Sequence, residues 1–131
     1  MKNKIYGLLF LTAMIYSAHA HAQGSPKPLD GRQYQVDLFI KEDKDSHQSL
    51  VFQEGTMTFS EGATYGFKAE PYKCKQKNDS TWTFLTISES KKNGTMTWDG
   101  KVVNDTIQGT IIWTRPVENP INYTFKGRAF K

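Results

Sequence analysis

Apolar and polar residues alternate at period two from Leu29 onward, which is the pattern of strands with one face on a core and the other in water. Tyr34, Val36, Leu38 and Ile40 form the first such run. Further runs follow at 49–53, 56–60, 66–75, 82–87, 94–102, 107–113 and 121–127. β-branched and aromatic residues dominate these runs, and no later window of more than about ten residues has helical spacing. The pattern predicts an all-β domain of about eight strands.

Turn signals separate the runs. Glu54-Gly55, Asn93-Gly94 and Asn104-Asp105 are typical of tight turns between strands, because these residues tolerate left-handed backbone geometry. The apolar phase of the run at 94–102 continues through Asp99-Gly100, so we place this dipeptide inside a strand. Pro71 changes the phase of its run, which indicates a bulge or an edge position.

Consecutive antiparallel strands with short connections favour a single antiparallel up-and-down barrel, because closure of the sheet removes its exposed edges. A two-sheet β-sandwich is the alternative. Gly100, Gly109 and Gly127 fall on positions that face inward in this pattern. Closing a small barrel requires sharp local coiling where a side chain would collide, so these glycines favour the barrel.

The chain begins with the features of a secretory signal peptide, which we assign to residues 1–22. A basic start is followed by an apolar stretch at 5–15 and by small residues ending in Ala20-His21-Ala22. The apolar stretch is shorter than the roughly 20 residues that a membrane-spanning helix needs. We therefore expect cleavage after Ala20 or Ala22, and an exported protein, periplasmic or secreted, whose mature form does not insert into a membrane.

Residues 23–28 are polar and contain two prolines, so they are expected to be a flexible lead-in. The barrel domain is expected to occupy residues 29–131. Loss of Lys2 and Lys4 with the signal would lower the formal charge from +4 to about +2, which argues against nucleic acid as a partner.

The composition offers little catalytic chemistry. His47, the one histidine outside the predicted signal, lies in the charged stretch 41–47, which we interpret as a surface loop. Cys74 is the single cysteine, which excludes an intramolecular disulfide, and we interpret it as a core residue. The acidic residues of the stretch 41–47 alternate with lysines and do not have the spacing of a metal site. Glu70 and Asp99 could meet across a barrel as the paired carboxylates of a glycosidase, and the sequence leaves this open. Our expectation is a protein that is not an enzyme and has no metal and no cofactor.

Several segments carry a resemblance to a known family: Leu29-Asp30-Gly31-Arg32, Tyr65-Gly66-Phe67, Pro71-Tyr72, the Gly-Thr-Met-Thr-Trp-Asp-Gly sequence at 94–100, Ile107-Gln108-Gly109-Thr110 and Trp113. With them, the chain resembles small secreted bacterial lipocalin-like proteins over nearly the whole domain. The resemblance implies a calycin-type barrel whose members mostly lack an assigned activity. The first strand lacks the Gly-x-Trp of ordinary lipocalins, so their ligand preferences are not carried over.

Aromatic residues fall largely on inward-facing positions and could line an apolar pocket at a barrel mouth. A small barrel can also fill its interior with such side chains. Arg128 ends the last strand and could offer two parallel hydrogen bonds to a ligand carboxylate. The candidate ligand-binding residues are Phe67, Tyr72, Trp82, Trp98, Trp113, Tyr123 and Arg128.

These observations lead to two hypotheses of function. The first is an exported, non-enzymatic binding protein that holds a small apolar or amphipathic ligand in an aromatic-lined barrel. The alternative is a protein-interaction module, such as an inhibitor of a secreted or periplasmic hydrolase, that acts through surface loops of a filled barrel. Residues 41–47 and 117–120 are the expected contact segments of that module.

Overall fold

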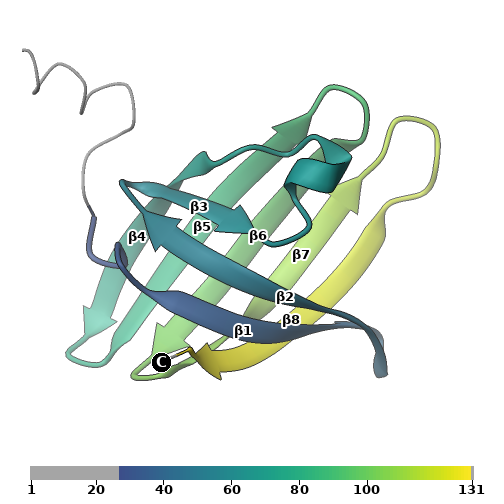
Figure 1. The fold of residues 1–131 in the computed structure, drawn as a ribbon. Helices are drawn as coiled ribbons and strands as arrows, with labels where there is room; N and C mark the ends of the chain where they lie inside the picture. Colours follow the sequence, from purple (N-terminus) through teal and green to yellow (C-terminus); the bar gives the residue numbers. More distant parts are fainter. Residues whose placement is uncertain (1–26, 131) are drawn as a thin grey trace, which may run out of the picture.

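The computed structural model describes residues 27–130 (Figure 1). The predicted signal peptide and residues 23–26 of the predicted lead-in lie outside this range. The strands are β1 (Gln33–Ile40), β2 (Asp43–Gln53), β3 (Thr56–Phe59), β4 (Glu70–Asn78), β5 (Thr81–Ser90), β6 (Gly94–Val103), β7 (Thr106–Thr114) and β8 (Ile121–Ala129), and a short 3₁₀ helix, η1 (Ala63–Tyr65), lies between β3 and β4.

Each strand pairs antiparallel with the next one along the chain, and β8 pairs with β1 to close the barrel. The closing seam runs from Tyr34 opposite Ala129 to Phe39 opposite Thr124. The up-and-down barrel is therefore confirmed and the two-sheet sandwich is wrong. Within residues 27–130, no helix is long and apolar enough to cross a membrane.

The inward-facing glycines mark places where the strands approach too closely for a side chain. A Cβ on Gly127 would lie 1.8 Å from the backbone oxygen of Gln35 on β1, and a Cβ on Gly109 would lie 2.2 Å from the backbone oxygen of Asp99 on β6. The predicted turns at 54–55, 93–94 and 104–105 are also confirmed, with positive φ angles at Glu54, Gly55, Gly94 and Asn104. The glycines and turn residues thus stand where a closed barrel needs them, so the local sequence and the overall fold are consistent.

The structure corrects two details of the sequence interpretation. The charged stretch 41–47 is not a loop, because β2 already begins at Asp43. Its side chains are mostly exposed at the rim of the barrel, so the apolar alternation that marks a half-buried strand is missing there. The run at 66–75 begins later than expected, at Glu70, because Gly66 has a φ of +83° and ends η1 in the left-handed conformation.

Aromatic side chains fill the middle of the barrel. The ring of Phe52 makes edge contacts with Tyr34, Tyr72 and Phe84, with centroid distances of 6.1, 4.9 and 5.2 Å. Phe125 lies between Phe84 and Trp98 at 6.5 and 5.5 Å. The interior is therefore packed over most of its length, as expected for a barrel of eight strands.

The segment before β1 closes one end of the barrel. Leu29 is fully buried there, and its amide donates to the Tyr72 hydroxyl at 3.0 Å. Asp30 accepts hydrogen bonds from the Tyr72 hydroxyl at 2.9 Å and from the amides of Lys27 and Gly55 at 2.8 and 3.0 Å. Burial alone would raise the pKa of Asp30, but these hydrogen bonds outweigh it and hold the pKa below the ordinary 3.8. Burial, together with the Asp30 carboxylate, raises the pKa of Tyr72 above its usual range.

We expect Asp30→Asn to lower the free energy of unfolding by about 1–3 kcal/mol at neutral pH, because the buried donors lose a charged acceptor. Asp30 has a lower pKa in the folded than in the unfolded chain, so its contribution is complete above the unfolded pKa and is lost as the pH falls through the folded pKa. Thermal denaturation from neutral to strongly acidic pH should therefore show the wild type converging on the variant. Asp79→Asn, at an exposed turn, is the control for loss of one carboxylate. A difference in stability between wild type and Asp30→Asn that stayed constant down to strongly acidic pH would contradict this role of Asp30.

Candidate functional site

A cavity of about 140 Å³ opens at the end of the barrel opposite the N-terminal segment; we call it the mouth pocket. This is the end where η1 and the β5–β6 and β7–β8 connections gather (Figure 1). Aromatic rings form most of its wall, and polar side chains form its rim. The lining residues are Leu38, Asp45, Ser46, Gln48, Phe59, Glu61, Tyr65, Phe67, Met96, Trp98, Trp113 and Tyr123.

Trp113 is held firmly at one side of the pocket. It lies near the end of β7, opposite Met96 of β6, and its indole Nε1–H donates to the backbone oxygen of Asn93 at 2.7 Å. The Arg115 guanidinium lies over its ring at 5.5 Å. Since both the polar and the apolar part of the side chain have partners, Trp113 presents a fixed aromatic surface to the pocket.

The connection between β3 and β4 carries Tyr65 and Phe67 over the mouth. The backbone oxygen of Tyr65 accepts hydrogen bonds from the Ser90 hydroxyl and the Asn93 side chain, both at 2.8 Å. Phe67 then turns inward and packs against Phe59 and Trp113, with centroid distances of 5.7 and 6.4 Å. The loop is thereby fixed to the β5–β6 end, and its two rings complete the aromatic wall.

Unpaired polar groups lie at the inner end of the pocket and on the strand next to it. Trp98 is fully buried against Phe59, yet its indole N–H has no hydrogen-bond partner among the described residues. The hydroxyls of Thr86 and Ser88, which lie opposite Trp98 and Met96 on β5, also lack a partner there. A buried unpaired group costs about 1–3 kcal/mol, so this side of the barrel has an unused capacity to hydrogen-bond a polar group.

The rim of the pocket is acidic. Gln48 is buried beneath it and donates to Glu61 Oε1 at 3.0 Å, while its side-chain oxygen accepts from the Glu61 amide at 3.0 Å. Asp45 lines the same rim. Burial raises the pKa of Tyr123, and the nearby Asp45 carboxylate raises it further. Arg115 lowers the pKa of Tyr123 but is itself paired with Glu118, so the rim favours a ligand group that is positively charged or donates hydrogen bonds.

The structure separates the predicted ligand-binding residues into two sets. Phe67, Trp98, Trp113 and Tyr123 all line the mouth pocket. The other three lie elsewhere: Tyr72 contacts Asp30 at the closed end, Trp82 lines a surface hollow with Arg32 at that end, and Arg128 is exposed on the outer wall of β8. The alternation of apolar and polar residues predicts which face of the sheet a residue occupies. The end of the barrel at which the residue lies depends on the register between strands, which the alternation does not give.

Sequence reasoning missed several residues of the pocket. Phe59 and Met96 continue the apolar alternation of their strands and could have been identified by phase. Asp45 was not recognised as a pocket residue, because the stretch 41–47 was interpreted as a loop. Glu61 lies in the irregular β3–β4 connection, where no periodic pattern indicates direction.

The other candidates for chemistry lie apart from the mouth pocket. The His47 ring nitrogens contact Asp37 at 2.9 Å and Gln35 at 2.6 Å on the outside of the barrel. Cys74 is half-buried, and burial raises the pKa of its thiol. Asp99 points outward, so it does not meet Glu70 inside the barrel. Within residues 27–130, no three His, Cys, Asp or Glu side chains are grouped as metal ligands.

Comparison with known proteins found no match: no family model fits the chain, and neither a curated protein nor a solved structure is significantly similar to it. The lipocalin-like resemblance of the sequence therefore stays a prediction, while the closed antiparallel barrel is a property of the structure itself.

Proposed function

We propose that this chain is an exported, non-enzymatic binding protein that holds one ring-sized apolar group of a small amphipathic ligand in the mouth pocket. The observation that carries the proposal is a cavity of about 140 Å³, open at one end, with aromatic walls and an acidic rim. A cavity of about 150 Å³ is enough to bind benzene, whereas a whole drug-sized ligand needs about 300–1,000 Å³. The pocket thus suits the apolar end of a ligand better than a complete lipocalin-type cargo.

The charge of the rim narrows the class of ligand. An apolar ring would pack between Phe59, Phe67 and Trp113, and a group next to the ring would lie near Asp45 and Glu61. Aromatic faces attract a cation, and carboxylates at the same opening strengthen that attraction. An arylalkyl amine meets both conditions, whereas an aryl carboxylate would be repelled.

Phenethylamine and phenylacetate test this proposal, because they share a ring and carry opposite charges. The three tryptophans report where binding occurs: Trp98 and Trp113 line the mouth pocket, and Trp82 lies at the other end. We expect phenethylamine to shift the indole N–H signals of Trp98 and Trp113 in an NMR titration and to leave that of Trp82 in place. Phenylacetate should bind more weakly.

Ser46→Phe places a ring in the mouth pocket and should weaken phenethylamine binding about tenfold or more. Ser49→Phe is the matched control, because Ser49 lies on the same strand with its side chain hydrogen-bonded to Gln35 instead of lining the pocket. Equal shifts of all three indoles, or equal binding by the two variants, would refute the mouth pocket as the binding site.

One observation favours the protein-interaction alternative. Val117 in the β7–β8 connection is 91% exposed beside the mouth, and Arg115 braces that connection by donating to the backbone oxygen of Asn119 at 2.6 Å. An exposed apolar side chain on a braced loop is suited to contact a partner protein. Inhibition assays on a panel of secreted hydrolases, with wild type and Val117→Asp compared, test this second candidate.

A further inference from the structure

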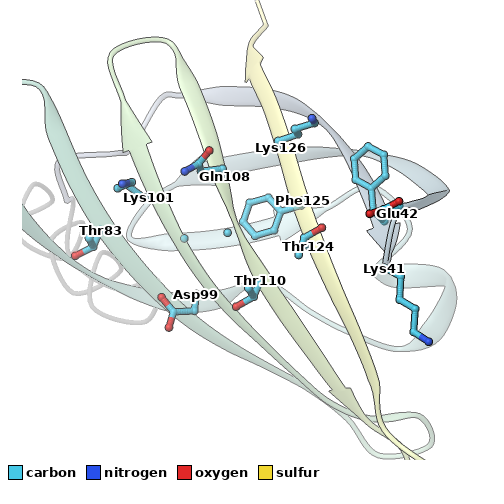
Figure 2. A pocket seen from close by; sticks show the side chains of 13 residues that line it. Lys41, Glu42, Thr83, Asp99, Lys101, Gln108, Thr110, Thr124, Phe125 and Lys126 are labelled. Atoms are coloured by element: carbon cyan, nitrogen blue, oxygen red, sulfur yellow. The ribbon is translucent and has the colours of Figure 1, made fainter.

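A second hollow, of about 670 Å³, lies on the outer wall of the barrel, away from the mouth pocket. It is bounded by outward-facing side chains of β5 to β8, with Phe39, Lys41 and Glu42 at one end. Figure 2 shows Lys101, Gln108 and Lys126 in one row across the strands and Asp99, Thr110 and Thr124 in the row beside it. We call this hollow the outer groove.

The glycines of the barrel explain why the wall is hollowed here. Gly100, Gly109 and Phe125 lie directly opposite one another on β6, β7 and β8. A Cβ on Gly100 would lie 2.4 Å from the Phe84 ring, and a Cβ on Gly109 would lie 2.6 Å from the Cα of Gly100. Because the inner face carries no side chains at this pair, the wall lies close against the core, and its outer surface is concave.

The row that contains Lys101, Gln108 and Lys126 continues past the edge of the hollow to a third lysine, Lys75 of β4, which does not line it. The strand register runs from Lys75 through Thr83, Lys101 and Gln108 to Lys126, so lysines occupy alternate strands and uncharged polar residues occupy the strands between them. Neighbouring strands are about 4.8 Å apart, so the backbones of successive lysines in the row are about 10 Å apart. We call these residues the lysine row.

The three ammonium groups have no carboxylate partner among the described residues. Lys126 lies over the Phe39 ring at 5.5 Å, and Asp37 at the end of the row is already paired with Lys44 at 3.2 Å. The side chains of Gln108, Thr110 and Thr124 likewise make no hydrogen bonds to the described chain. The groove therefore presents separated positive charges and unused hydrogen-bonding groups, with the carboxylates of Glu42 and Asp99 beside them.

We infer that the outer groove binds an acidic polysaccharide in which a carboxylate-bearing sugar alternates with a neutral one. The lysines of the row would pair with successive carboxylates, while Thr83 and Gln108 hydrogen-bond the neutral sugars between them. Asp99, Thr110 and Thr124 face the same chain from the second row and suit sugar hydroxyls, because a carboxylate accepts hydrogen bonds that hydroxyls donate.

Other polyanions fit the groove less well. Nucleic acid carries one phosphate per about 3.4 Å of each strand, far more closely spaced than the lysines of the row, and its bases favour stacking on aromatic side chains. Phe39 and Phe125 are the aromatic residues that line the groove; Phe125 is buried and Lys126 lies over the Phe39 ring, so neither offers a free face for stacking.

A hyaluronan octasaccharide is the probe, because its glucuronates alternate with neutral N-acetylglucosamine; a chitin oligosaccharide of the same length and single-stranded DNA are the comparisons. We expect the mature protein to bind the hyaluronan probe in calorimetry at low salt, more tightly than either comparison. The triple variant Lys75→Gln, Lys101→Gln, Lys126→Gln should lose affinity about tenfold or more. The matched triple variant Lys77→Gln, Lys91→Gln, Lys92→Gln removes the same charge from exposed positions outside the row and should change affinity less than about twofold.

Failure to bind hyaluronan, tighter binding of DNA, or equal losses in the two triple variants would each overturn the inference. The arylalkyl amine titration of the mouth pocket is independent of all three lysines of the row, so each proposal can fail without the other.

Discussion

Gly127→Ala is expected to destabilise the barrel by about 3 kcal/mol or more, because the added methyl group would collide with backbone that cannot move aside alone. The new Cβ would lie 1.8 Å from the Gln35 oxygen and 2.7 Å from the Val36 Cα, both on the neighbouring β1. Gly127 pairs with Val36 across the seam that closes the barrel. Relief of the collision therefore requires β1 and β8 to separate, which weakens closure itself.

Urea denaturation of wild type and Gly127→Ala measures this loss, and hydrogen exchange of the β1 and β8 amides locates it. Gly31→Ala is the matched control. Its Cβ would have no atom within 4 Å, so the cost there is only that of an alanine at a φ of +93°, about 1–2 kcal/mol. Equal losses in the two variants would mean that the seam is less crowded than the backbone geometry indicates.

The sequence predicted the wall of this barrel well, because each strand is half-buried and shows its period. Trp98 and Phe125 alternate with more exposed residues on long strands, and Gly94 and Asn104 at the turns adopt the positive φ angles that their chemistry allows. Fold class, strand number and the inward position of the glycines followed from such local patterns.

The sites were harder to predict, because they depend on relations between strands. Trp82 and Trp98 both face inward on neighbouring strands, yet one lies at the closed end and the other at the mouth. The lysine row could not be predicted from the sequence either. Lys75, Lys101 and Lys126 are far apart in the chain, and only the register between strands brings them into line. An even distribution of lysines along a sequence thus says little about their distribution on a sheet.

The mouth pocket is small because Trp98 fills the barrel beneath it, and Trp98→Ala is expected to change both stability and ligand size. The side chain is fully buried between Phe59 and Phe125, at centroid distances of 5.1 and 5.5 Å. Its truncation should cost about 3–5 kcal/mol, the range for large-to-small changes of buried aromatics. The vacated volume adjoins the mouth pocket, so the variant should accept a larger bicyclic ligand, such as tryptamine, that the wild type holds only weakly.

Trp98→Phe separates packing from hydrogen bonding. It keeps an aromatic ring and removes the buried indole N–H, which has no partner among the described residues, so its stability loss should be clearly smaller than that of Trp98→Ala. Tryptamine at about a hundredfold its dissociation constant should restore about 2.7 kcal/mol to Trp98→Ala, measured by thermal denaturation with and without the ligand. The same addition should leave Trp82→Ala unimproved relative to wild type, because Trp82 lies at the closed end. If tryptamine stabilised wild type and Trp98→Ala equally, Trp98 would not be the residue that limits the depth of the mouth pocket.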